Sequence, residues 1–149
     1  MNRDMGDSRE LTHLEPSQES GGVFLGRGIE GSVVMLNLLR FREVADYSAT
    51  PELAPPDPIS GAAAYQLYME HSLPYLQRVG STLMFLGEGG DYLVGPPGEG
   101  WDVAMLVRHQ SVESFMSFAA NDEYLAGAGH RTAALADSRL LPLVERRAV

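Results

Sequence analysis

The sequence predicts a single α+β domain whose elements follow the order strand, helix, strand, strand, helix, strand. The chain has 149 residues, 44% of them hydrophobic and 21% charged, which suits one packed globular domain. Short continuous apolar runs indicate the strands. Longer segments in which apolar residues recur every three or four positions indicate the helices.

The first half of the chain predicts a strand, a loop and a long helix. Residues 33–41 form an apolar run that opens with two β-branched valines, which favours a buried strand. Residues 42–58 contain four prolines and predict a loop. Ser60 is placed to cap the following helix, and Pro74 is expected to bend or interrupt it.

The second half predicts the remaining elements. They are expected at 82–86 (strand), 91–94 (a short extra strand), 101–109 (strand), 112–119 (helix), 121–135 (helical segment) and 139–144 (strand). This order is the ferredoxin-like, or split βαβ, pattern, with an antiparallel four-stranded sheet and two helices on one face. Residues 1–30 are expected to form an N-terminal extension that packs on the domain or on a partner, and residues 31–149 the domain itself.

Apolar residues lie on both faces of the predicted strands. In the first strand Leu36 and Leu38 share one face, whereas Met35 and Leu39 share the other. Two helices can cover only one face, and leaving the second in water would forfeit several kcal/mol at about 25 cal/mol per Å². We therefore expect a homodimer in which two copies pack sheet face against sheet face. The alternative is that residues 1–30 fold over the open face.

Composition excludes several functional classes. A net charge of −9 argues against nucleic-acid and anionic-membrane partners, because both need clustered cations. The absence of cysteine rules out disulfides and thiolate metal sites, and histidine spacing predicts no metal centre. No cofactor motif is present, no apolar run approaches the ~20 residues of a membrane helix, and the start of the chain does not look like a secretory signal. We expect a cytoplasmic protein without metal or cofactor.

Several short motifs occur in an order that resembles a known family. They are Val34 to Phe41 (VMLNLLRF), Gly61 with Tyr65 and Tyr68, Trp101-Asp102, Val107-Arg108, Asn121 to Tyr124 (NDEY), His130-Arg131, and Ala134 to Leu140. Together they resemble the domain of unknown function 1330 family over roughly residues 31–144. The resemblance implies the dimeric α+β barrel superfamily, and hence the same homodimer. It implies no established reaction, because superfamily relatives include cofactor-independent monooxygenases, isomerases, haem binders and ligand-binding regulators.

Three polar residues are candidates for catalysis. Asn37 is the only polar residue within the apolar core of the first strand, so its amide must find partners, either in the backbone or on a ligand oxygen. His71, three residues after Tyr68, and His130 are candidate proton carriers near neutral pH. For each histidine the structural alternative is a solvent-facing or packing role. His109, which ends a strand, is a weaker candidate.

Six further residues are candidates for substrate binding. Arginines can receive a carboxylate bidentately, and aromatic side chains can line a cavity, although ion pairing and core packing are the structural alternatives. The candidates are Arg40, Arg108, Arg131, Tyr68, Trp101 and Tyr124.

The sequence therefore supports two hypotheses of function. One is a ligand-binding dimer with a pocket between sheet and helices, which performs proton transfer or cofactor-independent oxygenation on a small carbonyl or phenolic compound. The other is a non-catalytic module that binds a metabolite or a protein. A cavity with convergent polar groups and a shifted pKa favours the enzyme, whereas a dry slot favours the binding module.

Overall fold

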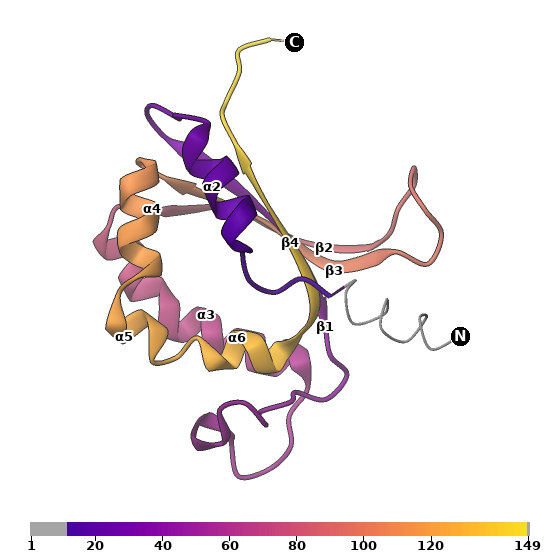
Figure 1. The fold of residues 1–149 in the computed structure, drawn as a ribbon. Coiled ribbons are helices and arrows are strands. Elements are labelled where there is room, and N and C mark those ends of the chain that lie inside the picture. Colours follow the sequence, from indigo (N-terminus) through magenta and orange to yellow (C-terminus); the bar gives the residue numbers. More distant parts are fainter. Residues whose placement is uncertain (1–11, 149) are drawn as a thin grey trace.

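Four antiparallel strands form one sheet in the order β2-β3-β1-β4. The computed structural model describes residues 12–148. The strands are β1 Val33–Phe41, β2 Thr82–Asp91, β3 Gly100–His109 and β4 Leu135–Leu143. Helices lie on one side of the sheet, and the other side is left open (Figure 1). The α+β ferredoxin-like fold expected from the sequence is confirmed.

Four of the described helices are capped by the side chain of the residue that precedes them. The helices are α2 Gln18–Gly26, the 3₁₀ turn η1 Pro51–Leu53, α3 Gly61–Arg78, α4 Val112–Ala119, α5 Asp122–Leu125 and α6 Gly129–Ala134. Ser17, Ser60, Ser111 and Asn121 each accept a hydrogen bond from a backbone N–H in the first turn of the helix that follows. Among residues 12–148, no helix is both long enough and apolar enough to cross a membrane.

Three expected boundaries were wrong. Strand β2 runs on to Asp91, so the separate strand expected at 91–94 does not form. The helical segment expected at 121–135 is divided into α5 and α6, and β4 begins at Leu135 rather than at 139. This early start is favoured because Leu135 and Asp137 pair with Phe41 and Arg40 of β1, respectively. Tertiary pairing thus overrides the helical pattern there.

Pro74 does not interrupt α3, which continues to Arg78. A proline removes one intrahelical hydrogen bond, here to the carbonyl of Glu70. Both residues are exposed, so this carbonyl can bind water instead.

Gly61, the first residue of α3, lies where three segments meet. The N–H of Arg42, just after β1, donates to the carbonyl of Ala134 at the end of α6 (2.8 Å). The N–H of Gly61 donates in turn to the carbonyl of Arg42 (3.0 Å). A Cβ atom at position 61 would collide with the backbone of both residues. Glycine therefore allows β1, α3 and α6 to converge.

Residues 12–27, here called the N-terminal strap, pack on the helix side of the sheet (Figure 1). The N–H of Ser138 in β4 donates to the carbonyl of His13 (3.0 Å), and the N–H of His13 donates to the carboxylate of Asp137 (2.7 Å). The ring of Phe24 in α2 meets Phe115 of α4 edge to face, with centroids 6.1 Å apart. The strap therefore does not cover the open face. Residues 1–11 lie outside the described residues, and the division at residue 31 stays a prediction.

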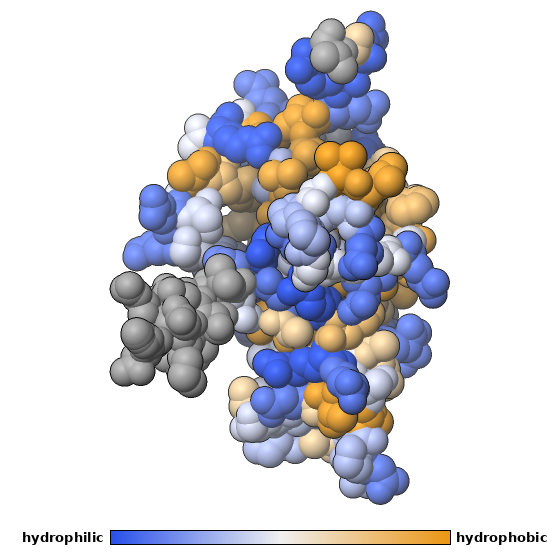
Figure 2. Space-filling model, turned by 90° about the vertical axis from the view of Figure 1, so that its right-hand side faces the viewer, coloured by the Kyte–Doolittle hydropathy of each residue, from blue (hydrophilic) through white to orange (hydrophobic). Residues whose placement is uncertain are grey.

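An apolar row crosses the open face of the sheet from edge to edge. The strand pairing aligns Phe85 with Leu106, Leu106 with Leu36, and Leu36 with Leu141, one residue from each strand. The outer two, Phe85 and Leu141, are 57% and 52% exposed. Figure 2, which views this side, shows apolar side chains gathered over the sheet.

The hairpin between β2 and β3 projects from the open side of the sheet (Figure 1). Near its tip, Leu93 and Val94 are 100% and 90% exposed. Two adjacent apolar residues that are so fully exposed at the tip of a projecting hairpin are unusual for a monomeric protein.

Candidate functional site

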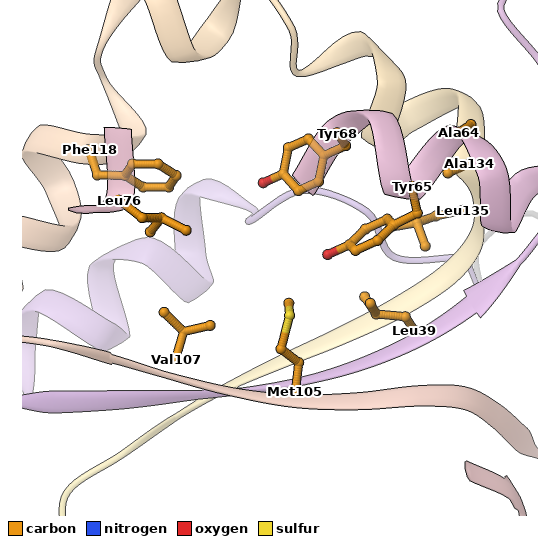
Figure 3. Packing of buried hydrophobic residues seen from close by; sticks show 10 residues of the cluster. All are labelled: Leu39, Ala64, Tyr65, Tyr68, Leu76, Met105, Val107, Phe118, Ala134 and Leu135. Atoms are coloured by element: carbon orange, nitrogen blue, oxygen red, sulfur yellow. The ribbon is translucent and has the colours of Figure 1, made fainter. Parts of the chain in front are cut away.

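A cavity of about 240 Å³ lies between the sheet and the helices. Met35, Asn37, Met105 and Val107 line it from the sheet. Side chains of α3, α4 and α5 line it from the opposite side. Most of them are apolar, and Figure 3 shows several, with the hydroxyls of Tyr65 and Tyr68 pointing from α3 into the space between the helices and the sheet. We call this space the inner cavity.

Two tyrosine hydroxyls meet at the wall of the inner cavity. The hydroxyl oxygens of Tyr68 in α3 and Tyr124 in α5 are 2.7 Å apart and share a hydrogen bond. Burial raises the pKa of Tyr124, and the neighbouring Tyr68 raises it further. Burial likewise raises the pKa of Tyr65, one turn before Tyr68. Tyr65 and Tyr124 therefore stay protonated at neutral pH and offer hydroxyl groups to an occupant of the cavity.

Ser72 lines the inner cavity one turn after Tyr68, on the same face of α3. Its side chain is 1% exposed, and its hydroxyl has no hydrogen-bond partner among the described residues. Leaving a buried hydroxyl unpaired costs about 1–3 kcal/mol. Such a group in a cavity wall is a natural partner for a polar atom of a bound molecule.

His109, at the end of β3, lines the inner cavity and is 2% exposed. Its Nδ1 shares a hydrogen bond with the Ser81 hydroxyl (2.7 Å), and Phe115 and Phe118 pack against the ring at centroid distances of 5.0 and 6.3 Å. Burial lowers the pKa of His109 to about 4. The imidazole is therefore neutral at pH 7 and can offer an acceptor or a donor, depending on its tautomer.

The lowered pKa of His109 predicts a loss of stability in mild acid. The ordinary pKa is 6.5 and the folded value is about 4, so the unfolded chain binds more protons between these values. The free energy of unfolding should fall by up to about 3 kcal/mol as the pH drops from 6.5 to 4. Urea unfolding at pH 7 and 4.5 should show this loss, and His109→Asn should remove most of it. An equal loss in the variant would contradict the assignment.

Asn37 and Arg131 complete the polar lining of the inner cavity. The Asn37 side-chain amide donates to the carbonyl of Met35 in its own strand (3.3 Å). The Nη1 atom of Arg131 donates to the carbonyl of Leu14 in the strap (2.8 Å), and Nη2 donates to the Ser138 hydroxyl (3.4 Å).

His71 and His130 do not line the inner cavity. The Nε2 of His71 lies 2.8 Å from the carbonyl oxygen of Glu123, to which it donates, so the ring ties α3 to α5. The Nδ1 of His130 shares a hydrogen bond with the Tyr47 hydroxyl (2.7 Å). Burial lowers the pKa of His130, with a smaller contribution from His71. Both histidines connect elements around the cavity rather than facing into it.

Arg40, Trp101 and Arg108 lie away from the inner cavity. The guanidinium groups of Arg40 and Arg139 lie 4.5 and 5.0 Å from the centre of the Trp101 ring. Arg40 also lies 3.6 Å from Asp137 and donates from Nε to the carbonyl of Gly100 (2.9 Å). Arg108 is exposed and pairs with Val34 on the open side of the sheet. Of the sequence candidates, Asn37, Tyr68, Tyr124 and Arg131 come together at the inner cavity, as does the weaker candidate His109.

A second and larger cavity, of about 690 Å³, lies beneath the N-terminal strap. Phe24 and Leu25 line it from the strap, and Met116 and Pro142 line it from α4 and β4. We call it the outer cavity. Among the described residues, no group of three or more histidine, aspartate or glutamate side chains is arranged to hold a metal ion.

The fold and most of the chain match a protein of known structure. The crystal structure of methylated RPA0582 protein is 31% identical, with 92% of this chain and 97% of that chain covered and a TM-score of 0.81. The chain belongs to the family of RPA0582. A second crystal structure of RPA0582, a protein of unknown function from Rhodopseudomonas palustris, is 33% identical, covering 92% and 99% of the two chains at a TM-score of 0.79.

Membership of the RPA0582 family assigns no activity, because that protein is itself described as having unknown function. A dimeric ferredoxin-like protein of unknown function from Thermobifida fusca matches more distantly, at 16% identity, 77% and 92% coverage and a TM-score of 0.46. No protein-family model matches the chain, and no curated protein does. Its place in the domain of unknown function 1330 family therefore stays a prediction.

Proposed function

We propose that the protein is a homodimer that binds a small carbonyl or phenolic compound in the inner cavity. The buried, unpartnered hydroxyl of Ser72 carries this proposal, because Ser72 belongs to the lining of a cavity that is otherwise mostly apolar. The hydroxyls of Tyr68 and Tyr124 and the neutral imidazole of His109 lie in the same lining. A few polar groups in an apolar enclosure are typical of sites that orient a small ligand.

The dimer is supported by the open face of the sheet. The apolar row Phe85-Leu106-Leu36-Leu141 lies on it, and the described part of the N-terminal strap packs on the opposite side. A second copy would shield this row from water, and the projecting tip with Leu93 and Val94 would find apolar contacts on it.

Proton transfer on the bound compound is a second candidate function. It is supported by the position of His109 in the cavity lining together with Asn37, whose amide can orient a carbonyl oxygen. Burial keeps the His109 imidazole neutral at pH 7, but its lowered pKa also makes it a weak base. Exchange of solvent deuterium into the methyl group of 4-hydroxyacetophenone would distinguish this reaction from binding alone. His71 and His130, the candidates from the sequence, would act only indirectly, through the positions of α3, α5 and α6.

Ser72→Ala is expected to separate binding from stability. The free protein should be as stable as the wild type or up to about 1 kcal/mol more stable, because an unpaired buried hydroxyl is lost. Affinity for 4-hydroxyacetophenone, measured by isothermal titration calorimetry, should fall about five- to tenfold with the lost hydrogen bond.

Ser81→Ala is the matched control, since the Ser81 hydroxyl has a partner in His109. It should lower the free energy of unfolding by about 1 kcal/mol. A Ser72→Ala protein that is clearly destabilised, yet binds 4-hydroxyacetophenone as well as the wild type does, would contradict the proposed role of Ser72.

A further inference from the structure

The inner and outer cavities share a boundary. Both spaces are lined by Leu14, Pro16, Met35, Phe115 and Leu140, and also by the charged pair Glu15 and Arg131. A molecule bound between the sheet and α3 could therefore extend beneath the N-terminal strap without leaving the protein. The shared wall is mainly apolar, which suits a hydrocarbon or aromatic body.

Arg131 is the one residue with a permanent positive charge in the described lining of the inner cavity. Its side chain is only 16% exposed, so its charge is poorly screened by water. Its described hydrogen bonds, both made by the terminal nitrogens, are to the Leu14 carbonyl at 2.8 Å and to Ser138 at 3.4 Å. The second is long for an N–H···O bond, so the guanidinium is not fully satisfied.

The nearest described carboxylate to Arg131 makes a weak partner. An oxygen of Glu15 lies 3.7 Å from Nη1 of Arg131, beyond hydrogen-bond distance, and the Glu15 side chain is 74% exposed. Because the Glu15 carboxylate is largely hydrated, we expect this ion pair to contribute little. A carboxylate held inside the cavity would interact more strongly with Arg131, because it would be less hydrated and could align with the planar guanidinium.

We propose that the joined cavities bind an amphipathic monocarboxylate, with its carboxylate on Arg131 in place of Glu15 and its apolar body along the shared wall. This inference rests on the proposed function of the inner cavity and names the class of compound that it accepts. The outer cavity is also lined by Arg139, but Arg139 is paired with Asp137 at 2.9 Å. Arg131 therefore matches one carboxylate, and the mostly apolar lining of the outer cavity matches a chain or ring attached to it.

Octanoate and 1-octanol are a matched pair of probes that differ in the charged group. Isothermal titration calorimetry on the full chain at pH 7.5 should show octanoate binding at least tenfold more tightly than octanol. Arg131→Gln should remove this difference and leave octanol affinity unchanged. Arg78→Gln is the control, because Arg78 is exposed on α3 and should leave both affinities unchanged.

Glu15→Gln tests the same proposal without touching a buried group. Removal of the competing carboxylate should raise the affinity for octanoate about threefold and leave octanol unaffected. Equal affinities for the two probes in the wild type, or no effect of either substitution on octanoate, would overturn the inference. If 4-hydroxyacetophenone binds and octanoate does not, only this inference fails. If none of the three probes binds, the proposed function fails as well.

Discussion

Replacing Phe85 by aspartate is expected to convert the proposed dimer into a monomer. Phe85 lies at one end of the apolar row, and a two-fold interface would bury the new charge twice. Burying an unpaired carboxylate costs several kcal/mol, so the dissociation constant should rise roughly 1,000-fold. Sedimentation velocity should show a 16.2 kDa species in place of one twice that mass. The monomer itself should keep its stability to within about 0.5 kcal/mol, because Phe85 is 57% exposed in it.

Val23→Asp is the matched control for this substitution. Val23 is a similarly exposed apolar residue (64%), but it lies in α2 on the helix side. The Val23→Asp protein should remain dimeric. A wild-type protein that sediments as a single 16.2 kDa species at micromolar concentration would refute the dimer outright, as would a Phe85→Asp protein with unchanged mass.

Gly61→Ala is expected to have the largest effect on stability of any single methyl addition in the described chain. The new Cβ would clash with the backbone of Arg42 and with the carbonyl oxygen of Ala134 (2.6 Å). A side chain could relieve such a clash by changing rotamer, but backbone atoms cannot. Relieving the clash would break the hydrogen bonds that join β1, α3 and α6. We expect the free energy of unfolding to fall by about 3 kcal/mol or more, measured by urea denaturation.

Gly22→Ala provides the control for alanine in a helix. Gly22 lies within α2, and a Cβ there would have nothing within 4 Å. Alanine should stabilise this helix by about 0.5–1 kcal/mol through its higher helix propensity. If Gly61→Ala were tolerated as well as Gly22→Ala, the convergence of the three segments would not depend on glycine.

The fold could be predicted from the sequence because its strands and caps are locally encoded. The run 33–41 and the cap Ser60 are confirmed where they were expected. The start of β4 at Leu135 could not be predicted, because it depends on pairing with β1, nearly 100 residues away in the chain. Local helical spacing gives no information about such a partner.

The candidate site was predicted only in part, because the burial of a side chain also depends on residues far away in the chain. Asn37, Tyr68, Tyr124 and Arg131 meet at the cavity because they project between sheet and helices. Ser72 was missed, since a serine in a helix looks like any solvent-facing residue until its burial is known. Its position four residues after Tyr68, on one helical face, is the feature that could have identified it. His109 was ranked low because the end of a strand is usually exposed, whereas here Phe115 and Phe118 cover the ring.

The attachment of the N-terminal strap to β4 has a consequence for the order of folding. The hydrogen bond between His13 and Ser138 joins residues 125 positions apart, and Ser138 belongs to the last described strand, β4. Docking of the strap on β4 brings the two ends of the domain together, and contacts of such long sequence separation form slowly. The wall of both cavities that contains Leu14 and Pro16 is therefore completed late. A molecule that binds against this wall stabilises the contact between the two ends of the domain, and it should slow their separation during unfolding.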